Sequence, residues 1–303
     1  RTGSSPRLSA HEPEPFLAIH PRDAELAGAG DRGLCRLISA YGSAVLRVRH
    51  EPEQPAGTVF APMHWTSRFA SHARVDSIVN AAADPLSGQP ELKHTPVRIE
   101  ALTPRWQAFL ISRRAVEIDD ASCSYWAVAV GRSCWRYELA GEAPPKDWHH
   151  WAEALLPPDP AGSDRLDYLD LAAAVYRQVR LVEGRLEVAL YVAGDRPEIA
   201  RGWLAALFDE ADVRRERLAL LGGRPSGNAR MAGQLICACL NVGRDVVERS
   251  IREGGVTSIA AIGDATGAGT GCGSCRPELS TMLRRHTSNP RVDRRAGPGA
   301  AAS

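Results

Sequence analysis

The sequence contains Ile236-Cys237-Ala238-Cys239 and, further along, Gly271-Cys272-Gly273-Ser274-Cys275. These two stretches hold four of the seven cysteines, as a C-x-C pair followed by a C-x-x-C pair. Pairs of closely spaced thiolates that folding brings together can enclose either a zinc ion or an iron–sulfur cluster. The spacing predicts one thiolate site with four ligands: Cys237, Cys239, Cys272 and Cys275. The spacing alone leaves open the choice between structural zinc and a cluster.

Glycine occupies every second position from Gly267 to Gly273, a stretch that runs into the second cysteine pair. A loop with so few Cβ atoms can approach a cofactor closely and can adopt positive φ angles. Its backbone N–H groups could then donate to the sulfides of a cluster, which is one of the influences on its reduction potential. Because no register of the loop satisfies G-x-G-x-x-G, we exclude a dinucleotide-binding turn here.

Three stretches around the cysteines resemble the bacterioferritin-associated-ferredoxin-like domain. They are residues 236–243, residues 251–259 and residues 266–279, the last of which includes Arg-Pro-Glu-Leu after Cys275. That family binds a 2Fe–2S cluster through C-x-C and C-x-x-C pairs, and all four cysteines are present here. The resemblance therefore implies that the four cysteines hold a 2Fe–2S cluster, and it favours a cluster over zinc. It predicts a small all-α helical domain over residues 232–286. From the residues themselves we expect Thr257 to be the N-cap of a short helix through Ala261, because its hydroxyl can accept from a free backbone N–H.

The composition is that of an ordinary globular protein: 303 residues, 44% hydrophobic, 24% charged, with a formal net charge of +1. This length allows two or three domains. A near-neutral charge gives no reason to expect nucleic acid or an anionic membrane as a partner, and no apolar run is long enough to span a membrane. The cysteines do not form a disulfide-type pattern, so we expect a cytoplasmic protein in which Cys35, Cys123 and Cys134 are buried thiols. The first residue is arginine, from which we expect a fragment or a processed piece.

The first hundred residues contain several short apolar runs and few helical patterns, which is typical of a β-barrel. Residues 34–39 and 44–49 alternate around Tyr41-Gly42-Ser43 and predict a hairpin. Residues 59–65 and 84–94 resemble the C-terminal molybdopterin-dinucleotide-binding domain of the dimethyl-sulfoxide-reductase superfamily, most closely that of assimilatory nitrate reductases. The resemblance implies a double-psi-like β-barrel over residues 16–102, after a flexible lead-in at residues 1–15.

The same resemblance implies which side chains contact the pterin cofactor. Lys93 and Asp76 lie where that family usually has a lysine and an asparagine that touch it. Asp76 departs from the pattern, because a carboxylate near a pyrophosphate is repelled whereas an amide is not. Further contacts are expected from four residues: Met63, His64, Trp65 and Gln89. The alternative for His64 and Trp65 is a core pair at the end of a strand.

Residues 103–223 contain strand-like and helical patterns without a chemical motif, and they predict a small α+β connecting domain. An amphipathic helix is expected over residues 145–156, and Glu183-Gly184 is expected to form the turn of a hairpin. A linker at residues 224–231 then leads to the cluster domain, and a disordered tail is expected at residues 287–303. The fold class predicted is thus multidomain α+β.

Together the resemblances imply the C-terminal electron-transfer portion of an assimilatory nitrate reductase. Electrons from an electron-donor protein or a flavoprotein reductase subunit would pass through the 2Fe–2S cluster. Their destination would be a molybdenum bis(molybdopterin guanine dinucleotide) cofactor, shared with N-terminal domains that the sequence does not contain. Nitrate would be the substrate of that complete enzyme, and we name no catalytic residue in this chain.

Three alternatives remain at this point. The chain could be a stand-alone 2Fe–2S ferredoxin-like or redox-sensing module that has kept a degenerate barrel. It could be a structural zinc protein whose cysteines stabilise a docking domain. A nitrite reductase chain is disfavoured by the resemblance of residues 16–102.

Overall fold

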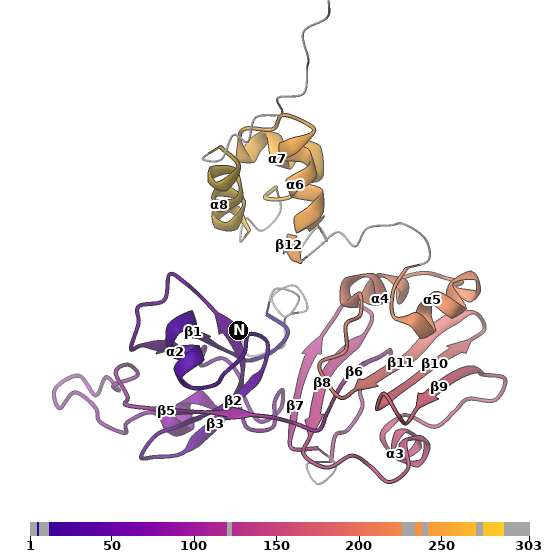
Figure 1. The fold of residues 1–303 in the computed structure, drawn as a ribbon, viewed down its shortest axis with the longest axis horizontal. Helices are drawn as coiled ribbons and strands as arrows, with labels where there is room; N and C mark the ends of the chain where they lie inside the picture. Colours follow the sequence, from indigo (N-terminus) through magenta and orange to yellow (C-terminus); the bar gives the residue numbers. More distant parts are fainter. Residues whose placement is uncertain are drawn as a thin grey trace, which may run out of the picture. The chain divides into compact units, whose positions relative to one another are not determined.

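The structure, a computed structural model, describes residue 5 and residues 12–119, 123–225, 234–237, 242–270 and 275–287. These residues belong to two units, Arg1–Ala229 and Arg230–Ser303 (Figure 1). Most of the predicted lead-in, linker and tail lies outside the described residues.

Five short strands form the first sheet. They are β1 (Phe16–Ile19), β2 (Leu34–Ile38), β3 (Ser43–His50), β4 (Val59–Phe60) and β5 (Arg98–Leu102), in the order β4-β1-β3-β2-β5. β2 and β3 form the predicted antiparallel hairpin. β1 runs parallel to β3 and is followed by helix α2 (Pro21–Leu26), whose first turn has a proline that suits that position.

The predicted closed barrel is not found in the described residues. β4 pairs with β1 and β5 pairs with β2, so this sheet is open and has two edges. β4 has only two residues. The long segment between β4 and β5 forms the 3₁₀ helix η1 (Val75–Ile78) and isolated bridges instead of a sixth strand. The described part of the chain therefore offers no strand that could join β4 to β5.

Six antiparallel strands form the second sheet. They are β6 (Trp106–Ser112), β7 (Tyr125–Val130), β8 (Trp135–Gly141), β9 (Asp164–Asp170), β10 (Val175–Val182) and β11 (Arg185–Ala193), in the order β7-β8-β6-β11-β10-β9. The expected turn between β10 and β11 is confirmed, with positive φ at both Glu183 (51°) and Gly184 (86°). Two consecutive positive φ angles suit the right-handed twist of a hairpin.

Helices cover both faces of this sheet (Figure 1). On one face α3 (Trp148–Leu155) packs its indoles against Trp106, with ring centroids 5.7 Å from Trp148 and 5.2 Å from Trp151. On the other face α4 (Arg201–Leu207) and α5 (Arg217–Gly222), which follows the short 3₁₀ helix η2 (Arg214–Glu216), cover a second apolar cluster. The predicted helix at residues 145–156 is α3, and it begins three residues later because Asp147 is its N-cap.

The two sheets of the first unit share one hydrophobic core, which contains residues of β1 to β3 and of β6 to β8. Backbone hydrogen bonds also join the segment between β4 and β5 to β7 of the second sheet, because Val128 N–H donates to Phe69 O at 2.8 Å and Ser71 N–H donates to Trp126 O at 2.9 Å. Residues 16–102 and 103–223 thus contribute to one unit. The predicted boundary at residue 102 remains a prediction.

The second unit contains α6 (Arg244–Arg252), α7 (Ile259–Thr266) and α8 (Arg276–Thr287), with a short antiparallel pair, β12 (Leu235–Cys237) and β13 (Val242–Gly243). The prediction of an all-α domain is therefore corrected by this strand pair. The predicted N-cap is also wrong: the Ser258 hydroxyl, not that of Thr257, accepts from Ala261 N–H at 3.1 Å at the start of α7. The core of the unit includes Ile236, Ile262 and Leu279.

Candidate functional site

Two of the four predicted cluster ligands meet in the second unit. Cys237 is the last residue of β12, and Cys275 directly precedes α8. Both are buried, with exposed fractions of 0% and 3%, and their sulfurs are close enough to share a hydrogen bond. Cys239 and Cys272 lie outside the described residues. One cysteine from each pair therefore contributes to the same buried place.

The pKa of the Cys275 thiol bears on how this pair could hold a metal ion or a cluster. Burial, the hydrogen bond with Cys237 and the electrostatic effect of Cys237 together raise the pKa of the Cys275 thiol to about 11. The buried Cys275 thiol therefore resists ionisation on its own. A bound metal ion supplies the positive charge that makes a coordinating thiol lose its proton.

The glycine loop lies beside this pair, because Ala268 belongs to the same buried cluster as Cys237 and Cys275. Gly267 and Gly269 have φ angles of +80° and +84°, which residues with a side chain rarely adopt. Gly269 lies against the start of α8, because a Cβ built on it would lie 3.1 Å from Leu279 Cδ1 and 3.6 Å from Arg276 Cγ. The donation of loop N–H groups to the sulfides of a cluster remains a prediction.

The predicted pterin contacts are mostly exposed. Met63 is 44% exposed, and His64, Gln89 and Lys93 are also exposed, whereas Trp65 is a buried member of the core. The core alternative for the pair at residues 64 and 65 therefore holds for Trp65 and not for His64. Among the described residues, none of these predicted contacts lines the cavity beside β2, β3 and β5 or the smaller one beside Arg180.

Asp76 faces solvent at the start of η1, and its carboxylate lies 3.5 Å from Arg74 with both side chains 58% exposed. Lys93 lies in an exposed stretch, residues 81–94, that contains a well-formed turn. The Asp84 carboxylate forms this turn by accepting from Leu86 N–H at 3.0 Å and Ser87 N–H at 2.7 Å. These hydrogen bonds lower the pKa of Asp84. The turn before Lys93 is thus held by its own hydrogen bonds while its side chains remain available.

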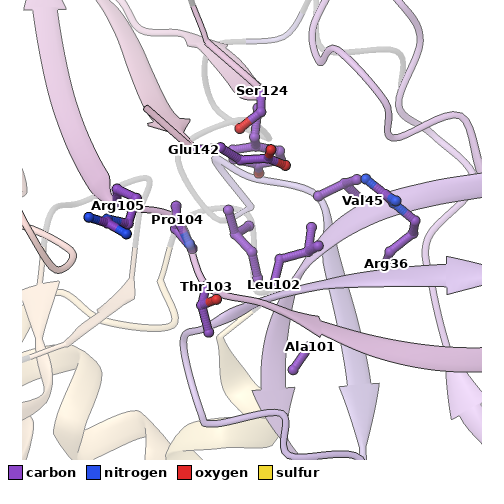
Figure 2. Close-up of a pocket in the computed structure, with 11 residues that line it drawn as sticks. Arg36, Val45, Ala101, Leu102, Thr103, Pro104, Arg105, Ser124 and Glu142 are labelled. Carbon is purple, nitrogen blue, oxygen red and sulfur yellow. The ribbon is translucent and has the colours of Figure 1, made fainter. Parts of the chain in front are cut away.

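A cavity of about 390 Å³ opens at the junction of the two sheets (Figure 2). Its lining is mixed, with apolar residues of β2, β3 and β5 beside charged ones. The charged side chains are Arg36, Arg105 and Glu142. In Figure 2 the two arginines lie at opposite ends of the labelled set. None of the predicted pterin or cluster residues lines this cavity, so it is not the predicted site.

A buried ionic network joins the two sheets of the first unit, and sequence reasoning did not identify it. The Glu14 carboxylate accepts from Arg47 of β3 at 2.8 Å and from the Tyr125 hydroxyl of β7 at 2.9 Å. Arg196 connects Glu14, at 3.2 Å, to Glu138 of β8, at 3.0 Å. Because Arg196 and Glu14 are 182 residues apart in the chain, no local pattern could have paired them.

Comparisons with known proteins assign both ends of the chain to domain families. Residues 1–96 match the molydopterin dinucleotide binding domain, and residues 235–285 match the BFD-like [2Fe-2S] binding domain. A nitrate reductase of Klebsiella oxytoca is 32% identical over 285 residues, which cover 93% of this chain. The chain is homologous to the C-terminal portion of nitrate reductases. The two domain families support both predicted cofactors, a 2Fe–2S cluster and a molybdopterin dinucleotide.

Other relatives match a smaller part. The assimilatory nitrate reductase catalytic subunit of Bacillus subtilis is 33% identical and a nitrate reductase of Synechocystis is 41% identical, each over 99 residues and 33% of this chain. The chain spans 32% of the length of the Klebsiella relative, and 13% and 14% of the other two. No helix that could cross a membrane is found in the part of the chain that the structure describes.

Proposed function

We propose that this chain is the electron-transfer and cofactor-capping portion of an assimilatory nitrate reductase. The observation that carries the proposal is the presence of both domain families in one chain that aligns with a nitrate reductase over 93% of its length. A chain with both a 2Fe–2S region and a pterin-binding region is suited to pass electrons from the cluster to the pterin cofactor. This combination favours nitrate reductase over a stand-alone ferredoxin-like module.

In the second unit the proposed ligands are Cys237, Cys239, Cys272 and Cys275. A bound 2Fe–2S cluster supplies one-electron transfer. The chain's own part is to hold the ligands, to exclude water and to set the potential. The burial of Cys237 and Cys275 supports this role, because a buried site limits solvent access to the sulfurs.

In the first unit we propose that Lys93 provides positive charge to a phosphate of the pterin dinucleotide. Its exposure supports the proposal, since a capping residue must remain available to a cofactor that other domains also hold. Gln89, His64 and Met63 are exposed in the same way and remain proposed contacts. Trp65 also remains a proposed contact, although its side chain is buried in the core. Asp76 already has a partner in Arg74, which reduces the repulsion that its carboxylate would exert on a phosphate.

In the complete enzyme, nitrate would be reduced to nitrite at the molybdenum centre, a reaction that consumes two electrons and two protons and releases water. The cluster would receive these electrons one at a time from an electron-donor protein or a flavoprotein reductase subunit in the cytoplasm. No residue of this chain is assigned a catalytic role in that reaction.

The test is iron, zinc and sulfide analysis of the anaerobically purified chain, together with its visible spectrum. We expect about two irons and two sulfides per chain and a red-brown absorption that bleaches with dithionite. Cys272→Ser and Cys275→Ser should lose that absorption, whereas Cys123→Ser, a buried thiol of the first unit, should keep it. One zinc per chain and no visible absorption would refute the proposal and support a structural zinc domain for docking instead. Undiminished colour in both ligand variants would show that the ligands are assigned wrongly.

A further inference from the structure

Residues 81–94 form an arm between β4 and β5 that is exposed along its whole length. Among the large apolar side chains that the structure describes, Leu86 is the most exposed, at 97%. Leu92, in the same arm, is 41% exposed. Single exposed leucines are common on protein surfaces, so the exposure of Leu86 indicates a contact only together with a second observation.

The second observation is that hydrogen bonds within the arm give it a defined conformation. Asp84 N–H donates to Gln89 O at 2.9 Å. Glu91 N–H donates to Ala82 O, also at 2.9 Å, so the two halves of the arm form a small hairpin. The turn of this hairpin includes Gly88, whose positive φ of +68° suits a glycine. The backbone at Leu86 is therefore held in place before any partner binds.

The acidic side chains of the arm have partners within the arm itself. The Asp84 carboxylate accepts from the Ser87 hydroxyl at 2.9 Å, in addition to the two backbone N–H groups of the turn. The Glu91 carboxylate accepts from Lys93 N–H at 2.7 Å. A contact that covered Leu86 would therefore leave neither carboxylate without a partner, which removes the main cost of burying this turn.

The arm orders fourteen residues and buries none of them. Ordering costs conformational entropy, which the burial of apolar surface normally offsets. The chain spans 32% of the length of the Klebsiella nitrate reductase, and the arm lies within the residues that match the pterin-binding family. About two thirds of such an enzyme lies outside this chain and is available to cover the arm.

We propose that the arm docks against the part of the complete nitrate reductase that lies outside this chain, with Leu86 as the anchor in an apolar pocket there. The inference rests on the proposed function, because the partner surface exists only in the complete enzyme. It adds a contact between protein and protein to the pterin contact proposed for Lys93. A preformed turn with one apolar anchor suits this role, because docking then orders few additional groups.

The experiment is hydrogen exchange of residues 81–94, followed by mass spectrometry, in the complete nitrate reductase and in this chain alone. An exposed hairpin opens at little cost, so its amides should exchange quickly in the chain alone. In the complete enzyme the arm must leave its pocket before it can open. Exchange there should be slower by about tenfold or more, because undocking exposes the Leu86 side chain to water.

Three variants of the complete enzyme test the anchor. Leu86→Asp should return the arm to the fast exchange of the chain alone, because an unpaired carboxylate is not accepted in an apolar pocket. Leu86→Met keeps the size and the apolar character of the side chain and should keep the slow exchange. The matched control is Leu218→Asp on α5, where the leucine is 81% exposed. This control should leave exchange of the arm unchanged.

A measurement on the chain alone shows that the variant folds. Because Leu86 is 97% exposed, Leu86→Asp should not change the midpoint of urea unfolding of the chain. A lower midpoint would mean that Leu86 stabilises this chain itself, and it would overturn its role as a docking anchor.

The remaining outcomes are distinct. Equal exchange of the arm in the complete enzyme and in the chain would overturn the docking. Slow exchange that survives Leu86→Asp but is lost in Lys93→Ala would show that the pterin contact holds the arm, and it would overturn the anchor. A chain that forms dimers with a protected arm would identify a second copy as the occupant instead. A chain without iron and sulfide would overturn the proposed function, whatever the exchange shows.

Discussion

The carboxylate of Glu138 provides the sharpest test of how the first unit is held together. It is 8% exposed and accepts from Arg201 through two hydrogen bonds, at 2.6 Å and 3.1 Å. Arg196 donates to it at 3.0 Å. Burial by itself would raise the pKa of Glu138, but the charges of Arg201 and Arg196 and the hydrogen bond from Arg201 outweigh burial and hold it at about 2.

The variant Glu138→Gln keeps the shape of the side chain and removes its charge. Moving the pKa from its ordinary 4.5 to about 2 corresponds to about 3 kcal/mol of folding free energy. Removing one partner of a buried ion pair costs about 3–5 kcal/mol, and Arg196 and Arg201 are about a quarter exposed, which favours the lower end. We therefore expect a loss of about 3 kcal/mol at pH 7.

Urea unfolding monitored by tryptophan fluorescence measures this loss, because all seven tryptophans lie in the first unit. With a slope of about 3 kcal/mol per molar urea, the midpoint should fall by about 1 M. The matched control is Glu198→Gln, whose side chain is 90% exposed and pairs with Arg224 at 3.3 Å. An exposed pair contributes about 0–1 kcal/mol, so the control should change little. The reasoning is refuted if the two variants lose the same stability.

The pH dependence of this difference has a defined sign. A carboxyl group whose pKa is lower in the folded state stabilises the protein above its ordinary pKa, and this contribution disappears as the pH falls through the folded-state pKa. The difference between wild type and Glu138→Gln should therefore be full above pH 4.5 and should shrink towards zero near pH 2. A difference that stays constant over this range would assign the loss to packing rather than to charge.

Two further predictions concern the N-cap of α7 and the proposed pterin contact. Ser258→Ala should destabilise α7 by about 1 kcal/mol, because it removes the acceptor for Ala261 N–H, whereas Thr257→Ala should have little effect. Hydrogen exchange of residues 259–266 measures this, with about fivefold faster exchange expected for Ser258→Ala only; equal exchange in both would contradict the assigned cap. The sequence has two lysines, Lys93 and Lys146. In the complete nitrate reductase, Lys93→Ala should lower the molybdenum content while Lys146→Ala should not, and equal contents in the two variants would count against the proposed contact.

Much of the local structure could be predicted from residue pattern. The hairpin of β2 and β3, the turn at Glu183-Gly184 and helix α3 follow from alternation, turn chemistry and amphipathic spacing, and all three are confirmed. Each depends on residues that are close in sequence, so local preferences decide it. The cap of α7 was missed by one residue because serine and threonine are both good N-caps and stand side by side at 257 and 258.

The open edges of the first sheet could not be read from sequence. Strand pairing depends on which edges meet in space, and neither the short apolar runs nor the family resemblance that predicted a barrel shows which strands will pair. The shared core of the two sheets has the same origin, because it brings together residues far apart in the chain, such as Phe69 and Val128.

The sequence alone therefore determined the chemistry that the chain can offer: two thiolate pairs, a glycine loop beside them, and two regions whose families match by comparison. These are properties of residue type and short spacing. The tertiary structure decided that Cys237 meets Cys275 and that Glu14 and Glu138 share Arg196. Each of these contacts joins segments distant in the chain, and packing of buried side chains, rather than any local preference, brings them together.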